Sequence, residues 1–436
     1  MAKLIDITGK AIPGEWGTED TEGTGIPVLR TTNFTNDGVV DYSDVVTRAI
    51  TKKSINEKYL RYGDIVIEKS GGSDKQPVGR VIFFQGNENT YLFNNFTGLL
   101  RVKEPSKWYP RYVFYALFAN YKTGGTRRFE NKTTGLHNLK TDDYVTSFDV
   151  KDNSLEVQMK ICSILDQTKE LINKSQKQLI KLDDLVKARF VELFGDPVSN
   201  PKGWKKKALS EEADIKIGPF GSLLHREDYV SGGHALVNPS HIVEGKISTD
   251  ANLTLTDEKY EELSPYHLLP GDVVMGRRGE MGRCAVVEQE GLLCGTGSLL
   301  IRTKGDLSAD YIQKIISFPS FKRTIEDMAV GQTMPNLNVP IVSRFQIIKP
   351  PKSVQDEYYA FVTQVDKSKV VVQKALLRRK MLEMIGYQEY FVCVWLQGCH
   401  WIIWKSSFMM LPPRKTRQFR RGNAVKSWVL SLISFT

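Results

Sequence analysis

The residue types that perform catalysis are present in this sequence, but their spacing matches none of the common catalytic patterns. The chain has no GxxxxGK[ST] phosphate loop, no HExxH pair and no GxSxG nucleophile turn. Pro350-Pro351 lacks the Asn or Asp and the aromatic residue that would clamp a flipped base. Cys393, Cys399 and His400 match no zinc spacing, and the six histidines are dispersed. We therefore expect no catalytic residue and no metal site.

Two further patterns suggest chemistry only weakly. Asp64 with Glu68 and Lys69 could be a nuclease-like acidic cluster. The matching positions in the second half of the chain are Gly276 and Arg277, which favours a structural role in a strand. Residues 295–297 form a lone GxG sequence, which is more typical of a turn than of a nucleotide site.

Basic residues occur beside glycine-containing turns in equivalent places of the two halves. Glycine lets a loop approach a groove closely. Arg and Lys bind phosphates, and Arg and Gln can form bidentate hydrogen bonds with guanine and adenine. The candidate DNA-binding residues are Lys69, Lys75, Arg80, Arg127, Arg128 and Lys132 in the first half, and Arg277, Arg278, Arg283, Lys322, Arg323 and Gln332 in the second. Each alone could be a solvated loop charge, but the recurrence favours contact with double-stranded DNA.

The overall charge is a poor guide to where such a surface lies. The chain carries 60 basic and 50 acidic residues, a net charge of +10. Residues 392–436 hold seven of the basic residues and no acidic residue, so residues 1–391 have 53 basic and 50 acidic residues. With a net charge of only +3, a DNA-binding surface there must come from local clustering.

Both halves predict the same order of elements to position these loops. Runs rich in β-branched residues predict strands at residues 26–33, 64–69, 79–85 and 99–102, and a helix follows at 110–121. The second half repeats the order at residues 235–239, 270–274, 281–286, 309–317 and 336–337, displaced by 198 to 208 residues. This self-similarity predicts a duplicated unit, in which a mixed α/β domain precedes a long helix.

The first long helix is predicted at residues 154–195. Leu165, Ile172, Leu179 and Val186 recur every seven residues, which is the pattern of a helix packed lengthwise on a partner. The positions beside them are filled by Ile161, Ile164, Thr168, Leu171, Ser175, Leu182 and Leu185. Ser154 suits an N-cap, and Gly195 suits the C-terminal cap.

The second long helix, from about residue 353 to 385, supplies the expected antiparallel partner. Its core residues are Phe361, Val365, Val372 and Leu382, and Ser368 and Arg379 interrupt the apolar stripe. The predicted fold class is α+β, with two α/β-type domains separated by two long antiparallel coiled-coil helices in a pseudo-twofold duplication.

The predicted map has a domain at 1–153, a spacer helix at 154–195, a second domain at 196–352 and a second spacer helix at 353–391. Residues 392–436 contain four of the seven Trp residues and no acid. We expect an appended or out-of-frame, disordered extension there, the alternative being a basic-aromatic interaction tail. The absence of a long apolar run and the five scattered cysteines predict a cytoplasmic protein without a membrane span.

Residues 181–197, KLDDLVKARFVELFGDP, resemble the central region of type I restriction–modification specificity subunits. Residues 331–337, GQTMPNL, are similar to the polar turn that closes the target recognition domains of this family. Residues 388–391, QEYF, resemble the point at which such chains stop. The resemblance in domain order extends over residues 1 to about 391.

The resemblance implies a non-catalytic subunit that reads a bipartite DNA target, with one recognition domain per half-site. The paired helices would dock two methyltransferase subunits, and a restriction/translocase subunit would join them. The chain itself would hold no cofactor, since S-adenosylmethionine and ATP/Mg are expected on the partners. The alternatives are a stand-alone two-domain DNA-binding or scaffold protein, and a fused restriction enzyme, against which the missing motifs argue.

Overall fold

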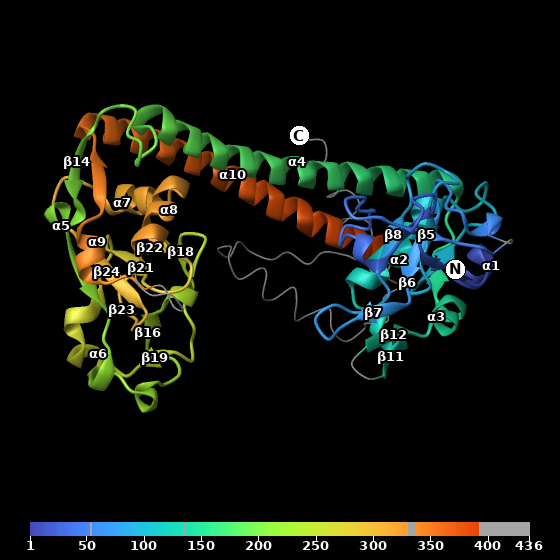
Figure 1. The fold of residues 1–436 in the computed structure, drawn as a ribbon. Coiled ribbons are helices and arrows are strands. Elements are labelled where there is room, and N and C mark those ends of the chain that lie inside the picture. Colours follow the sequence, from blue (N-terminus) through green and yellow to red (C-terminus); the bar gives the residue numbers. More distant parts are fainter. Residues whose placement is uncertain (53–54, 134–135, 330–335, 392–436) are drawn as a thin grey trace, which may run out of the picture. The chain divides into compact units, whose positions relative to one another are not determined.

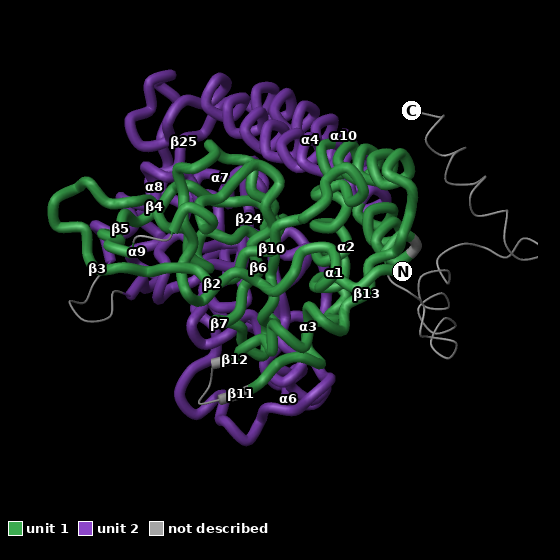
Figure 2. The backbone as a smooth tube through the Cα atoms, turned by 90° about the vertical axis from the view of Figure 1, so that its right-hand side faces the viewer, with its two compact units in different colours: residues 1–170, 380–436 green, residues 171–379 purple. Residues whose placement is uncertain are grey.

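The computed structural model describes residues 1–52, 55–133, 136–329 and 336–391. The chain divides into two compact units (Figure 2). Unit 1 comprises residues 1–170 and the segment that begins at residue 380, and unit 2 comprises residues 171–379. The predicted domains 1–153 and 196–352 lie in unit 1 and unit 2 respectively, and both division points fall inside the long helices.

Unit 1 contains small sheets covered by helices (Figure 1). Its first sheet has the order β2 (Ile12–Pro13), β10 (Thr97–Leu100), β6 (Ile65–Glu68) and β8 (Val81–Phe83). Its second has the order β3 (Thr18–Glu19), β5 (Val46–Ala49), β4 (Ile26–Leu29) and β9 (Leu92–Phe93). A third joins β11 (Glu130–Thr133), β12 (Leu136–Leu139) and β7 (Ser70–Gly72), and β1 (Ala2–Lys3) pairs with β13 (Asp149–Val150). The helices are α1 (Leu4–Thr8), α2 (Pro110–Lys122) and α3 (Thr141–Ser147).

Helix α2 forms the centre of the unit 1 core. Pro110 occupies its first turn, where the missing N–H removes no helical hydrogen bond. Nearly every later residue of α2 is buried, among them Tyr112, Phe114 and Leu117. These side chains pack in one cluster with Phe83 of β8. The predicted helix at 110–121 is therefore the element on which the first sheet packs.

Unit 2 repeats this arrangement with additional elements. Its first sheet has the order β15 (Ala213–Ile217), β24 (Ser298–Thr303), β21 (Val273–Gly276) and β22 (Cys284–Val286). Its second has the order β19 (Thr254–Leu255), β16 (His234–Val237), β23 (Leu292–Cys294) and β20 (His267–Leu268). The remaining strand pairs are β14 (Lys205–Ala208) with β25 (Gln346–Lys349) and β17 (Ile242–Val243) with β18 (Lys246–Ile247). The helices are α5 (Leu209–Glu212), α6 (Asp257–Glu262), α7 (Ala309–Ile316), α8 (Pro319–Met328) and α9 (Val339–Ser343).

The strand order confirms the predicted duplication. The sheet β2-β10-β6-β8 corresponds to β15-β24-β21-β22, with antiparallel neighbours throughout. In each unit one parallel pair, β4 with β9 or β16 with β23, lies in the second sheet. The strand predicted at 26–33 is too long: it ends at Leu29, because residues 31–33 form a 3-10 turn in which Asn33 accepts a hydrogen bond from the Arg30 N–H at 2.9 Å.

An aspartate–arginine brace is repeated at the turn before each central strand. In unit 1, the Arg101 Nε and Nη2 atoms donate to the Asp64 carboxylate at 2.8 and 2.6 Å. In unit 2, Arg302 donates to Asp272 in the same way, at 2.8 and 2.7 Å. Gly63 and Gly271, which precede the aspartates, have φ of 90° and 91°, a backbone region that favours glycine. The repeated Gly-Asp pair in the sequence therefore serves the fold of the turn.

The two long helices are α4 (Leu155–Phe194) and α10 (Lys352–Tyr390). The Val157 N–H donates to Ser154 Oγ at 3.4 Å, and Gly195 has φ of 76°, so both predicted caps of α4 are present. Helix α10 ends at Tyr390, within one residue of the end predicted for the second spacer helix at residue 391.

Contacts within each unit show how the helices pair. In unit 2, Asp183 of α4 forms an ion pair of 2.8 Å with Lys369 of α10, and Arg189 pairs with Glu357. The order of these pairs along the two helices is antiparallel. Arg379, predicted only to interrupt the stripe, donates to Ser175 Oγ and to the Leu171 carbonyl oxygen. In unit 1, Leu165 of α4 lies against Gly386 of α10.

The predicted helix-pair core residues occupy buried or half-buried positions. Leu165, Ile172, Val186 and Val365 are buried, and Leu179, Phe361, Val372 and Leu382 are half-buried. The prediction for two neighbouring positions is wrong: the side chains of Leu171 and Leu185 are exposed. Each directly precedes a seam residue, Ile172 or Val186, and therefore points about 100° away from it around the helix.

Candidate nucleic-acid interface

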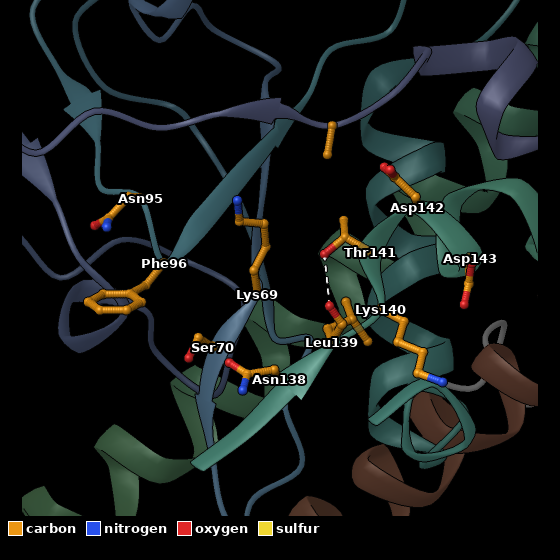
Figure 3. A pocket seen from close by; sticks show the side chains of 11 residues that line it. Lys69, Ser70, Asn95, Phe96, Asn138, Leu139, Lys140, Thr141, Asp142 and Asp143 are labelled. Carbon is orange, nitrogen blue, oxygen red and sulfur yellow. Dashed lines mark hydrogen bonds between the residues drawn. The ribbon is translucent and has the colours of Figure 1, made fainter. Parts of the chain in front are cut away.

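In unit 1, three chain segments meet at Lys69 and form a small platform (Figure 3). The Lys69 N–H donates to the Phe96 carbonyl oxygen at 2.8 Å, and the Leu139 N–H donates to the Lys69 carbonyl oxygen at 2.8 Å. These bonds join the turn before β10, the end of β6 and strand β12. We call Lys69, Asn95, Phe96 and Asn138 the unit 1 platform.

Unit 2 builds the same platform from different residues. The Arg277 N–H donates to the Gly297 carbonyl oxygen at 3.0 Å, and the Leu337 N–H donates to the Arg277 carbonyl oxygen at 3.0 Å. Arg277 therefore takes the place of Lys69, and Asn336 takes the place of Asn138. The Arg277 Nε atom donates to Asn336 Oδ1 at 3.0 Å, which orients the guanidinium group. Burial and the neighbouring Arg278 lower the pKa of Arg277.

A cleft of about 690 Å³ borders the unit 1 platform. Lys69 lies between the Asn95–Phe96 turn on one side and Asp142 of α3 on the other (Figure 3). Burial lowers the pKa of the Lys69 ammonium, and the charge of Asp142 acts in the opposite direction. The aliphatic stem of Lys69 packs over Gly98, where a Cβ atom would lie 3.3 Å from Lys69 Cδ. A cation is thus held at the floor of a polar cleft.

Arg80 was predicted to contact DNA, and the structure places it differently. Its Nε and Nη2 atoms donate to the Glu68 carboxylate at 3.1 and 2.8 Å. Its Nη1 and Nη2 atoms also donate to the carbonyl oxygens of Phe34 and Thr31. With these donors engaged and the side chain largely buried, we assign Arg80 to the fold rather than to the DNA-binding surface. Glu68, the suspected acidic cluster residue, is its partner.

Arg283, the counterpart of Arg80, belongs to a more open network. It donates to the Pro239 carbonyl oxygen at 3.2 Å and to Glu280 Oε2 at 2.6 Å. Lys322 also donates to Glu280, at 3.1 Å. These hydrogen bonds lower the pKa of Glu280 below its ordinary value. Two predicted DNA-binding residues are therefore grouped around one carboxylate.

The other predicted residues are spread over the surfaces of the units. Lys75, Arg127 and Arg128 are exposed in unit 1, and Lys75 and Arg127 line a second cleft of about 620 Å³. Arg278 and Arg323 are exposed in unit 2. Lys132 lies in β11, in the part of that strand whose side chains the structure does not describe, and Gln332 lies outside the described residues.

Sequence reasoning missed Asn95 and Phe96. They lie between two strands, where a Phe would ordinarily be expected in the core, whereas Phe96 is 51% exposed. The available signal was the run Asn94-Asn95-Phe96, in which two turn-forming residues precede the ring.

No cluster of three or more His, Cys, Asp or Glu side chains suited to a metal occurs in the described part of the chain. Three described cysteines, Cys162, Cys284 and Cys294, are buried, and burial raises the pKa of each thiol to about 12. Cys393, Cys399 and His400 lie outside the described residues, as does the whole predicted extension at 392–436. None of the helices in the described ranges has the length and apolar character needed to cross a membrane.

A scan against models of known protein families gave no match. Solved structures are similar over most of the chain. One belongs to a study of the assembly and conformational transition of a type I restriction–modification system; it is 14% identical, with 89% of this chain and 96% of that chain covered and a TM-score of 0.59. Another is the S subunit of a type I restriction–modification system from M. genitalium, also 14% identical, with 89% and 95% covered and a TM-score of 0.50. The chain therefore has the fold of type I restriction–modification specificity subunits, as the resemblance at residues 181–197 implied.

Proposed function

We propose that this chain is the DNA sequence-specificity subunit of a type I restriction–modification complex. The observation that carries the proposal is the S-subunit fold, which extends over about nine tenths of this chain and nearly all of its solved counterparts. In this role each unit reads one half of a bipartite target. The chain itself is not catalytic, and methylation and cleavage are performed by partner subunits that hold S-adenosylmethionine and ATP with Mg.

The duplicated platform supports the assignment of one half-site to each unit. Lys69 in unit 1 and Arg277 in unit 2 occupy the same backbone position and carry the positive charge that a DNA groove attracts. The remaining basic residues proposed to contact DNA are Lys75, Arg127, Arg128, Lys132, Arg278, Arg283, Lys322 and Arg323, with Gln332 beside them in sequence. Lys75, Arg278 and Arg283 lie on loops, where an exchange would change the target without changing the fold.

Exposed apolar side chains on the helix pair support docking of methyltransferase subunits. In unit 2 they are Leu171, Ile180, Leu185, Val191, Val370, Val371 and Leu377, and in unit 1 Val157, Met159, Met381, Met384 and Ile385. Exposed apolar residues that together form a patch are typical of an interaction site. We assign one methyltransferase to the set in each unit.

The test is to co-express this chain with a type I methyltransferase subunit from the same source and to sequence the methylated adenines. We expect a split motif with a fixed gap. A chain that binds DNA tightly and specifically alone, without any methylation, would instead indicate the stand-alone DNA-binding protein.

Docking is tested separately by the double variant Ile180→Asp with Val371→Asp. We expect loss of the methyltransferase bound through unit 2, measured as the mass of the purified complex. Phe220→Asp, which places the same charge at another exposed apolar position of unit 2, is the control and should leave the mass unchanged. Equal losses in both variants would contradict docking on the helices.

A further inference from the structure

Phe96 is an exposed aromatic ring on a rigid turn. The residue is 51% exposed, although the backbone around it is held by hydrogen bonds. The Phe96 carbonyl oxygen accepts from the N–H groups of Lys69 and Ser70, at 2.8 and 3.2 Å. One residue on, the Thr97 N–H and hydroxyl both donate to the Asn94 carbonyl oxygen, at 3.1 and 2.8 Å. These bonds fix the backbone of the turn and with it the direction of the Phe96 Cα–Cβ bond, and the residue is exposed to solvent there.

The surroundings of Phe96 favour the bases of DNA over its phosphates. Asn95 is exposed beside the ring, and Lys69 lies next to both (Figure 3). On the other side of the cleft are the carboxylates of Asp142 and Asp143. Two negative charges disfavour a phosphate group in this cleft. The other groups at the cleft are the Asn95 amide, the Phe96 ring and the Lys69 ammonium, which can bind hydrogen-bonding and apolar groups of a ligand.

An A·T base pair presents these two kinds of group together in the major groove. Adenine offers N6 and N7, which an Asn amide can bind in a bidentate manner, and thymine offers its C5-methyl group, which a Phe ring can contact. We propose that the Asn95–Phe96 turn reads an A·T pair in the half-site of unit 1, with Phe96 on the thymine methyl group and Asn95 on the adenine edge. This inference rests on the proposed function and names the chemistry of one half-site.

Unit 2 has the same backbone turn but lacks the Asn amide and the Phe ring. The Ser298 N–H donates to the Gly295 carbonyl oxygen at 3.0 Å, as Thr97 does to Asn94, and Thr296 and Gly297 replace Asn95 and Phe96. A Cβ atom on Gly297 would lie 2.9 Å from Pro239 Cδ, so a side chain there requires Pro239 to move. The pairing of an aromatic ring with an Asn amide in this turn is therefore confined to unit 1.

The experiment removes the methyl group from the DNA and the ring from the protein. The methyltransferase complex of this chain is prepared, and its motif is established by mapping methylated adenines. Each thymine of the motif is then replaced in turn by deoxyuridine, and binding is measured by competition. Replacement of one thymine in one half-site should weaken binding about fourfold, which corresponds to about 0.8 kcal/mol for one buried methyl group.

Phe96→Ala should remove this sensitivity. The variant complex should bind the thymine duplex more weakly than the wild-type complex does. It should bind the thymine duplex and the deoxyuridine duplex with equal affinity. Asn95→Ala should relax the preference for the adenine of the same pair. Tyr62→Ala removes another exposed aromatic ring of unit 1 and is the control; it should keep the fourfold sensitivity. Phe96→Leu, which keeps an apolar side chain, covers the case in which the alanine variant fails to fold and should retain part of the sensitivity.

A split motif in which no thymine is sensitive to deoxyuridine would overturn this inference and leave the proposed function intact. Undiminished sensitivity in a folded Phe96→Ala complex would also overturn it. A complex that methylates no split motif would overturn the proposed function, and the inference with it.

Discussion

Arg80 in unit 1 and Arg283 in unit 2 occupy equivalent positions but belong to different environments. Both donate to a carbonyl oxygen of the corresponding loop, Thr31 in unit 1 and Pro239 in unit 2. The carboxylate partner of Arg80 is Glu68 of strand β6, whose side chain is 1% exposed, whereas the partner of Arg283 is Glu280 in a turn, whose side chain is 54% exposed. An arginine that recurs in a duplicated sequence can thus be part of the core in one copy and part of the surface in the other.

The first prediction removes the carboxylate partner of each of these two arginines. Glu68→Ala leaves the largely buried Arg80 guanidinium without its partner and should lower the free energy of unfolding of unit 1 by about 3–5 kcal/mol. Glu280→Ala, the matched change in unit 2, should cost at most about 1 kcal/mol because the pair is exposed. Hydrogen exchange as a function of denaturant measures each unit separately. Equal losses in the two units would refute the difference in environment.

The second prediction concerns the Asp–Arg brace, which the units share. Asp64→Asn and Asp272→Asn each remove charge-assisted hydrogen bonds from a buried carboxylate and should each cost about 1.5–3 kcal/mol in the unit concerned. The same exchange measurement applies, and the unaltered unit is the internal control. If only one unit is destabilised, the brace is not equivalent in the two copies.

The third prediction uses DNA binding. The double variant Arg277→Ala with Arg278→Ala should weaken recognition of one half-site by about 1–3 kcal/mol per lost base contact and leave the other half-site unaffected. Binding of the complex to duplexes altered in one half-site at a time measures this. Arg80→Ala is the comparison variant, since its effect should be on unfolding rather than on base preference. A loss shared by both half-sites would contradict separate reading by the units.

The smallest effect is expected from the pH dependence of Glu280. Its pKa lies below the ordinary 4.5 because Arg283 and Lys322 donate to the carboxylate. Since the folded pKa is the lower one, the contribution to stability is present above pH 4.5 and is lost as the pH falls through the folded pKa. The urea midpoints of wild type and Glu280→Gln should therefore differ slightly at pH 7 and converge in acid. A gap that widens on acidification would show that the sign is wrong.

The long helices and the duplication were predictable because they depend on periodic and repeated features. The seven-residue spacing from Leu165 to Val186 and the caps at Ser154 and Gly195 define α4 without reference to the rest of the chain. The apolar pattern of the second helix was followed only to about residue 385, but α10 continues through Gly386, which packs against Leu165. Tertiary contact overrides local propensity in this case.

The sequence predicted which loops carry the basic residues of the candidate site, but not which contacts each residue makes. Arg80 follows Gly79, and Lys69 precedes Gly71 and Gly72. The sequence does not disclose that Arg80 pairs with Glu68 while Lys69 makes no ion pair with any described residue. The exposure of Phe96 could not be predicted, because it depends on the hydrogen bonds that hold the turn. Such differences arise from contacts between residues far apart in the chain.

Unit 1 is assembled from two separate parts of the chain, and this has a consequence for folding during synthesis. Tyr387 and Phe391 complete the core of unit 1, where they pack against Tyr115 and Tyr112, whereas unit 2 is one continuous segment. Domains generally fold as units while the chain emerges. Unit 2 can therefore finish first, and unit 1 must wait, with aromatic side chains uncovered, until α10 has been made. A released chain that is truncated after residue 379 should show protease resistance in unit 2 and leave the core of unit 1 open to proteolysis.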